Sequence, residues 1–188
     1  MLDKREIIVG VAGGVAAYKA AMLTSLLVQR GAGVTAVLTR NARRFVGVAT
    51  FAALTGRPVA TRSFDPSAHP LGGHIELAAR ADLVIVAPAS ADLLAKAAAG
   101  VADDLLATLL LSAECPVAMA PAMNTAMWAK PAVQRNVRRL EDDGVTIIPP
   151  GSGWLSCRQQ GAGRMAEPEA ILAVIEGMLA DHFGPRTI

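Results

Sequence analysis

The sequence predicts an α/β fold, in which a doubly wound parallel sheet carries helices on both faces. Short β-branched apolar runs alternate with longer segments of helical periodicity along the whole chain, which is the pattern of such folds. The run "LVIVAP" (83–88) has no polar face, as expected of a central strand that is buried on both sides. We therefore expect a Rossmann-like, three-layer α/β/α arrangement. No repeat or linker divides the 188 residues, so residues 1–188 are expected to form a single domain.

The individual elements follow from periodicity and from glycine and proline signals. Apolar runs predict strands at residues 6–12, 33–39, 83–88, 116–121 and 145–150. Helical periodicity covers residues 15–31, 43–54, 74–82, 90–113 with a break at Gly100, 125–143 and 167–183. Residues 57–73, which hold three prolines and two glycines, are expected to form a loop with at most a short strand near Val59. The Gly-rich segment 151–165 is also predicted to be a loop.

The composition is apolar for a soluble domain, with 53% hydrophobic and 18% charged residues. The apolar runs are broken by acidic residues well before the ~18 residues that a membrane span requires. The N-terminal apolar run ends in two glycines and not in a cleavage pattern, which disfavours a signal peptide. We therefore expect a cytoplasmic subunit that buries apolar surface in an oligomer. A net charge of +2 is too small to indicate nucleic acid, and no metal-ligand pattern is found.

Ligands of open α/β sheets bind at the carboxyl ends of the strands. Gly13 and Gly14 follow the first strand and begin a helix, which favours a bound phosphate, although their spacing does not match G-x-G-x-x-G. The second strand ends in Thr39 and Arg40, where an NAD enzyme would carry an acid for the ribose. A nucleotide-like phosphate is expected and NAD is disfavoured. The alternative is an ordinary turn between strand and helix.

Polar side chains follow two further strands. Ser90 comes after the third and Asn124 after the fourth of the strands given above. Either residue could simply cap the next helix. The Asn124 amide could also hold a carboxylate or the polar edge of a flat ring, with Met123 and Met127 as an apolar wall beside it or as ordinary core residues.

Three further side chains carry reactive groups. His74 opens a helix after two glycines, where it is either a structural cap or an accessible base near neutral pH. Cys115 begins an apolar strand and is expected in the core. Cys157 lies in the Gly-rich segment and has no such structural explanation. Two cysteines do not form a disulfide framework.

Four motifs resemble one family, the homo-oligomeric flavin-containing cysteine decarboxylases. They are "GGVAAYK" (13–19), "HIELAARADLVIVAPASADLLAKAAAGVADDLL" (74–106), "APAMNTAMW" (120–128) and "GAGRMAEP" (161–168). The resemblance covers about residues 6 to 178. It is most similar to the branch of the family that acts on phosphopantothenoylcysteine in coenzyme A biosynthesis.

The resemblance implies FMN as cofactor and a homotrimer or homododecamer with the active site between subunits. It assigns catalysis to His74, Asn124 and Cys157: the asparagine holds the substrate carboxylate, and the cysteine donates a proton from a mobile loop of about residues 151–166. Met123 and Met127 are placed near the substrate or the flavin. The flavin-binding positions it implies are Gly13, Gly14, Thr39, Arg40, Ser90, Ala91, Asp92, Leu93 and Ala122.

The implied reaction is thiol oxidation, loss of CO2 and re-reduction of the enethiol to 4'-phosphopantetheine, with a separate ligase chain supplying the substrate. The chain departs from the family pattern in one place: many relatives have Cys-Gly-Asp where this sequence has Cys157-Arg158-Gln159. Two alternatives share the fold: a peptidyl-cysteine decarboxylase, which lacks the cysteine, and a non-catalytic FMN-binding regulator, which carries acidic tails. A flavin prenyltransferase and a plain dehydrogenase are disfavoured.

Overall fold

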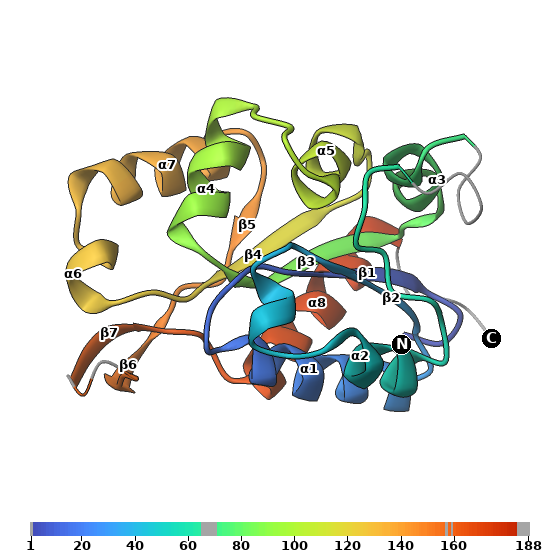
Figure 1. The fold of residues 1–188 in the computed structure, drawn as a ribbon, viewed down its shortest axis with the longest axis horizontal. Helices are drawn as coiled ribbons and strands as arrows, with labels where there is room; N and C mark the ends of the chain where they lie inside the picture. The colour runs from blue at the N-terminus through green and yellow to red at the C-terminus, as the bar shows by residue number, and fades with distance from the viewer. Residues whose placement is uncertain (1, 65–70, 157, 159, 184–188) are drawn as a thin grey trace.

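The computed structural model describes residues 2–64, 71–156, 158 and 160–183. In this part of the chain a five-stranded parallel sheet has the strand order β2-β1-β3-β4-β5 (Figure 1). The strands are β1 (Glu6–Val11), β2 (Gly33–Leu38), β3 (Leu83–Ala89), β4 (Val117–Pro121) and β5 (Thr146–Ile147). From β1 the chain first adds β2 on one side and then β3, β4 and β5 on the other, so the direction of winding reverses between β1 and β3. The predicted doubly wound α/β fold is confirmed.

Helices cover both faces of the sheet (Figure 1). One face carries α1 (Ala17–Gln29), α2 (Val48–Thr55) and α8 (Pro168–Phe183). The other face carries α3 (Gly73–Arg80), α4 (Ala91–Ala99), α5 (Leu105–Ser112) and α7 (Pro131–Asp142). This arrangement gives the three predicted layers.

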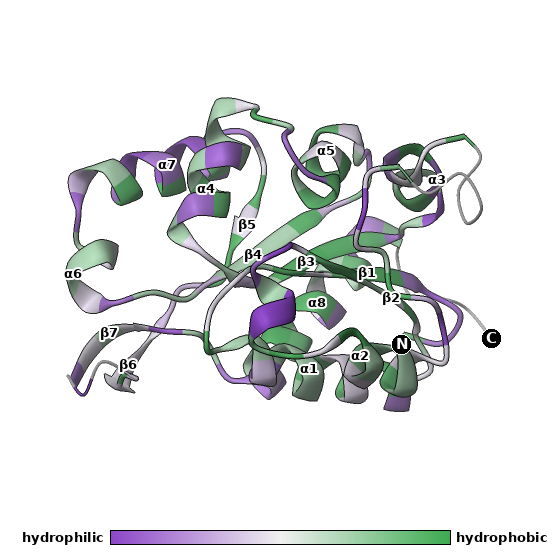
Figure 2. Cartoon of the chain, in the orientation of Figure 1, coloured by the Kyte–Doolittle hydropathy of each residue, from purple (hydrophilic) through white to green (hydrophobic). Residues whose placement is uncertain are grey.

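The core divides into two parts, one on each side of the sheet. In β1, Ile7 and Val9 pack with the residues of α1 and α8, whereas Ile8 packs on the opposite face. This alternation is the period of two that a strand imposes on its side chains. All seven residues of β3 are buried, and Figure 2 shows the hydrophobic colour concentrated along the central strands. The apolar run at 83–88 is therefore the central strand that its composition predicted.

Two predicted helices are interrupted. The segment 125–143 forms α6 (Thr125–Trp128) and α7, because Lys130 precedes Pro131 and takes an extended conformation (ψ 133°), as residues before proline generally do. The segment 43–54 forms a 3-10 turn, η1 (Ala42–Arg44), and then α2. Gly47 between them is also extended, with ψ 154°.

The prediction of a loop at 151–165 is wrong. Residues Gly151–Trp154 (β6) and Gln160–Arg164 (β7) pair as an antiparallel hairpin. The hairpin lies at the carboxyl edge of the main sheet, near α6 (Figure 1). Near Val59, where at most a short strand was expected, the structure has only a single parallel bridge between Val37 and Ala60, outside the named strands.

Candidate functional site

A cavity of about 560 Å³ lies at the carboxyl ends of β1, β3 and β4, enclosed on one side by the hairpin. Its volume falls within the ~300–1,000 Å³ typical of small-molecule sites. Eight of its lining residues were expected from the sequence: Gly13, Gly14, Ser90, Ala91, Ala122, Met123, Asn124 and Met127. The other lining residues are Val15, Ala16, Tyr18, Trp154, Leu155, Ser156, Gly163, Arg164 and Met165.

The glycine turn after β1 gives this cavity a face of exposed backbone. No side chain caps α1 at Ala16, and the first turn of the helix holds no acidic residue. A Cβ on Gly14 would have no heavy atom within 4 Å, whereas one on Gly13 would lie 2.5 Å from Cβ of Asn41. The helix dipole and the free amino end of α1 therefore favour an anion here.

The turn after β2 borders the site without lining the cavity. The Thr39 hydroxyl oxygen accepts a hydrogen bond of 3.2 Å from the Ala42 backbone N–H. The close packing of Gly13 against Asn41 brings this turn alongside the glycine turn. Thr39 and Arg40 thus lie beside the cavity but are not among its lining residues.

Ser90 is the N-cap of α4, because its Oγ accepts a hydrogen bond of 3.3 Å from the Leu93 backbone N–H. The Leu93 side chain is 2% exposed and packs in the core. The Asp92 side chain points to solvent and forms an ion pair with Lys96. Neither side chain reaches the cavity, so Asp92 and Leu93 can contribute at most backbone groups.

Asn124 is both a helix cap and a wall of the cavity. Its Oδ1 accepts a hydrogen bond of 2.7 Å from the Ala126 backbone N–H at the start of α6. The two readings of this residue are therefore compatible: the capping bond fixes the orientation of the amide, and the amide lines the cavity. Met123 and Met127 line the cavity beside it.

The hairpin packs directly on the segment that carries Asn124. The Met123 backbone N–H donates a hydrogen bond of 2.9 Å to the Gly163 carbonyl oxygen. A Cβ on Gly163, where φ is +127°, would collide with the carbonyl oxygen of Met123, and a Cβ on Gly161 would lie 2.6 Å from Thr125 Oγ1. Only glycine allows β7 to approach this closely.

Arg164 is the one charged side chain among the described lining residues. Its guanidinium lies 3.0 Å from Glu167 Oε1, and the same oxygen accepts a hydrogen bond of 2.9 Å from Lys19 Nζ. Lys19 is 3% exposed and also donates to the Met165 carbonyl oxygen. The Lys19 hydrogen bond holds the pKa of Glu167 below its usual value. Two cations on one carboxylate leave this wall with net positive charge.

His74 does not line the cavity. It lies in the first turn of α3, which packs on α5 at the opposite end of the molecule from α6 (Figure 1). One chain therefore does not bring His74 and Asn124 together. Cys157 lies outside the described residues, but its neighbour Ser156 lines the cavity.

The sequence reasoning missed the apolar and aromatic walls of the site, among them Tyr18 and Trp154. The two residues are 52% and 66% exposed, and large hydrophobic residues that are exposed together indicate a ligand-binding or interaction surface. Tyr18 lies within "GGVAAYK", so that motif carried the only signal. Trp154 was assigned to a loop, and nothing in its neighbourhood indicated that it would face the ligand site.

The arrangement suits a flat cofactor that carries a phosphate. Exposed backbone at a helix amino end, apolar side chains and a fixed amide meet in one cavity. Among the described residues, no group of three His, Cys, Asp or Glu side chains is placed to hold a metal ion. The described helices include none with the length and apolarity needed to span a membrane.

Known proteins with similar sequences include bifunctional coenzyme A biosynthesis proteins named CoaBC. The Bacillus subtilis protein is 46% identical over 187 residues, covering 100% of this chain and 45% of the relative. The Mycobacterium tuberculosis protein is 49% identical over 179 residues, covering 95% of this chain and 42% of the relative. The chain thus spans less than half the length of these relatives.

Similar solved structures include two whole-chain matches. The FMN-dependent cysteine decarboxylase SpaF has a TM-score of 0.83 at 34% identity, covering 96% of this chain and 98% of its own. A PPC decarboxylase mutant complexed with pantothenoylaminoethenethiol has a TM-score of 0.82 at 32% identity, covering 92% and 97%. The family model described as Flavoprotein matches residues 1–180. The chain therefore belongs to the Flavoprotein family.

Proposed function

We propose that this chain is an FMN-dependent decarboxylase that converts 4'-phospho-N-pantothenoylcysteine to 4'-phosphopantetheine in coenzyme A biosynthesis. The observation that carries the proposal is the convergence of the glycine turn, Ser90 and the fixed Asn124 amide on one cavity. The similarity to CoaBC proteins and to a PPC decarboxylase supports the substrate class.

The described residues fit FMN. Backbone groups at Gly13 and Gly14 suit its phosphate, and Ser90, Ala91 and Ala122 line the cavity where the rest of the cofactor would be held. Thr39 and Arg40 would border it from the adjoining turn. FMN held there would supply the redox chemistry: it can accept a hydride from the carbon that bears the substrate thiol and can give one back.

Asn124 would bind the substrate carboxylate. An N-acylated cysteine cannot form an imine, so CO2 is lost only after the thiol has been oxidised to a thioaldehyde, which accepts the electrons as an enethiolate. A neutral amide holds the carboxylate without the ground-state stabilisation that a cation would give, and such stabilisation would oppose CO2 loss. The bond to Ala126 keeps the amide in one orientation before the substrate arrives.

Proton movements fall to His74 and Cys157. When the C–H hydride of the thiol carbon is transferred, the thiol proton must leave, and a neutral imidazole is a suitable acceptor. His74 belongs to α3 and Asn124 caps α6, and these two helices lie at opposite ends of the molecule (Figure 1). We therefore propose that His74 reaches the cavity of another copy in a homo-oligomer, either a trimer or a dodecamer. Cys157 would protonate the enethiolate when the hydride returns.

The proposal is tested by measuring CO2 release from phosphopantothenoylcysteine together with the visible spectrum of the purified protein. We expect one FMN per chain, CO2 release and a saturated thiol product. A flavin-loaded protein that releases no CO2 would instead favour a non-catalytic FMN-binding protein. An oxidised enethiol as the final product would favour the peptidyl-cysteine decarboxylase, and a protein without flavin would contradict the whole assignment.

A further inference from the structure

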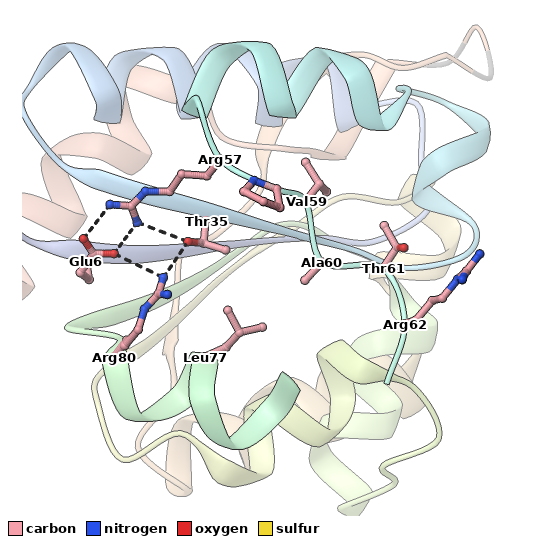
Figure 3. Close-up of a pocket in the computed structure, with 10 residues that line it drawn as sticks. Glu6, Thr35, Arg57, Val59, Ala60, Thr61, Arg62, Leu77 and Arg80 are labelled. Atoms are coloured by element: carbon pink, nitrogen blue, oxygen red, sulfur yellow. Dashed lines mark hydrogen bonds and ion pairs between the residues drawn. The ribbon is translucent and has the colours of Figure 1, made fainter. Parts of the chain in front are cut away.

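A second cavity lies beside the edge strand β2, and Glu6 at the amino end of β1 is part of its lining (Figure 3). Its volume is about 730 Å³, and it shares no lining residue with the Asn124 cavity. The segment 57–62 forms one wall, and α3 forms the other with Leu77 and Arg80. This gives the chain a second space of ligand size that is separate from the cavity lined by Asn124.

One ion pair in this cavity has a structural explanation. Both terminal nitrogens of Arg57 bond the Glu6 carboxylate, with Nη2 at 2.9 Å from Oε1. The pair lies across β2 at Gly33, where a Cβ would collide with the carboxylate. It fastens the segment after α2 to β1, and the Arg57 hydrogen bond lowers the pKa of Glu6. Arg57 alone is sufficient to fasten this segment to β1.

The cavity holds more positive charge than that pair uses. Arg80 Nη2 lies 3.8 Å from Glu6 Oε2 and donates to Thr35 Oγ1 at 3.3 Å, while Arg57 Nη1 donates to the same oxygen at 3.4 Å. Arg62 lines the other end of the cavity (Figure 3). The described lining thus carries three arginines and one carboxylate, and two of the guanidinium groups share both that carboxylate and one hydroxyl. The net positive charge of the lining favours a further anion.

Thr35 adds a buried donor to this cluster. The residue is 6% exposed, and its hydroxyl oxygen already accepts from both guanidinium groups. No hydrogen bond that this hydroxyl donates is found among the described residues. Because Thr35 lines the cavity, the hydroxyl is placed to donate to a ligand oxygen there. Val59, Ala60 and Leu77 form an apolar surface beside it.

We propose that this cavity is a binding site for a small phosphate monoester with a compact apolar body. A phosphate dianion supplies the two negative charges that the three arginines and Glu6 leave unbalanced, and its oxygens accept from Arg80 and from the Thr35 hydroxyl. The apolar body of the ligand packs against Leu77 and Val59. The site is separate from the decarboxylation assigned above, so either can be correct without the other.

Phenyl phosphate is the probe for this site, and its binding to the purified flavin-loaded protein is measured by titration calorimetry. We expect saturable binding, one molecule per chain, that weakens with added salt. Arg80→Gln and Thr35→Val should each weaken it about tenfold, since each removes a hydrogen bond to a charged group. Arg138→Gln, on the exposed surface of α7, is the matched control and should bind as the wild type does.

Variants at both cavities separate this site from the Asn124 cavity. Arg164→Gln should leave phenyl phosphate binding unchanged, and phenol, which lacks the phosphate, should not bind at millimolar concentration. The proposal is overturned if the wild-type protein does not bind phenyl phosphate, or if Arg80→Gln and Thr35→Val bind it as tightly as Arg138→Gln does. It is also overturned if Arg164→Gln abolishes binding, because the probe would then occupy the other cavity.

Discussion

At the scale of single residues, Asn124 has an observed structural role and a proposed chemical one. Its side-chain oxygen caps α6 through Ala126, and the residue lines the cavity in which the substrate is proposed to bind. If a substitution removes the cap, a loss of activity could therefore come either from lost stability or from lost catalysis. Aspartate separates the two effects, because it retains the capping oxygen but brings a negative charge to the place where the substrate carboxylate must bind.

We expect Asn124→Asp to keep the melting temperature and bound FMN of the wild type and to lose at least about 100-fold in turnover, since two carboxylates repel each other in a cavity of low dielectric. The control is the opposite replacement, Asp104→Asn, at the N-cap of α5, where the Asp104 carboxylate accepts a hydrogen bond from the Ala107 backbone N–H. That variant should keep full activity. Normal turnover by Asn124→Asp would exclude the carboxylate role.

Arg164 is expected to bind the substrate phosphate, since it is the one charged side chain among the described lining residues. Arg164→Gln should raise KM for phosphopantothenoylcysteine about tenfold or more, while the slower turnover of the dephosphorylated substrate stays as in the wild type. Steady-state kinetics with both substrates provides the measurement. An equal effect on the two substrates, or loss of flavin, would show that the arginine acts elsewhere.

At the scale of elements, the hairpin β6–β7 is the part of the fold that the sequence did not predict. The residues of β7 are Gln160–Arg164, "QGAGR", without a single β-branched side chain, so propensity gives no strand signal. What forms the strand is close packing of Gly161 and Gly163 against Met123–Thr125, a contact between segments distant in sequence. By contrast, β3 and β4 were predictable because an unbroken apolar run leaves few alternatives to a buried strand.

Gly163→Ala is predicted to displace the hairpin from the Asn124 segment, because its Cβ would meet the Met123 carbonyl oxygen and φ is +127°. We expect a loss of about 2–4 kcal/mol in the free energy of unfolding together with weaker substrate binding. Gly177→Ala in α8, where a Cβ meets nothing within 4 Å, serves as control and should be neutral or stabilising by about 0.5–1 kcal/mol. Denaturant titration and KM measure both effects. An unchanged Gly163→Ala protein would mean that the hairpin is not held by this contact.

The Glu6–Arg57 pair joins β1 to the segment after α2, and its contribution should depend on pH. The Arg57 hydrogen bond is the main reason why the pKa of Glu6 is lowered from its ordinary value of 4.5. The pair therefore stabilises the fold fully above pH 4.5, and this stabilisation is lost as the pH falls through the lowered pKa of the folded protein. Glu6→Gln should cost about 1 kcal/mol at pH 7, given the partial exposure of both side chains, and the difference should disappear in acid. The exposed Glu141→Gln is the control; a pH-independent cost would contradict this account.

At the scale of the whole molecule, the candidate site was predictable only in part. Gly13, Ser90 and Asn124 could be placed together because the carboxyl ends of parallel strands share one edge of the sheet. Local spacing could not show that the Asp92 and Leu93 side chains turn to solvent and core, since that depends on the rotation of α4. Nor could local spacing show that α3, which carries His74, lies at the opposite end of the molecule from α6. That position depends on the course of the chain between β2 and β3.

The separation of His74 and Asn124 is what makes a homo-oligomer necessary to the proposed reaction. The apolar side chains exposed at the cavity, such as Tyr18 and Trp154, agree with a surface that another copy covers. In such an assembly each site takes Asn124 from one chain and His74 from another. Two different inactive variants should therefore restore each other's activity.

The most direct measurement is CO2 release by oligomers co-expressed from His74→Asn and Asn124→Asp chains. Each variant alone should be inactive, with FMN bound, and random mixing should restore about a quarter of wild-type activity, because a quarter of the sites then combine an intact His74 with an intact Asn124. Mixed, flavin-loaded oligomers with no more activity than the two parents would contradict the claim that these residues act together on one substrate across a subunit boundary.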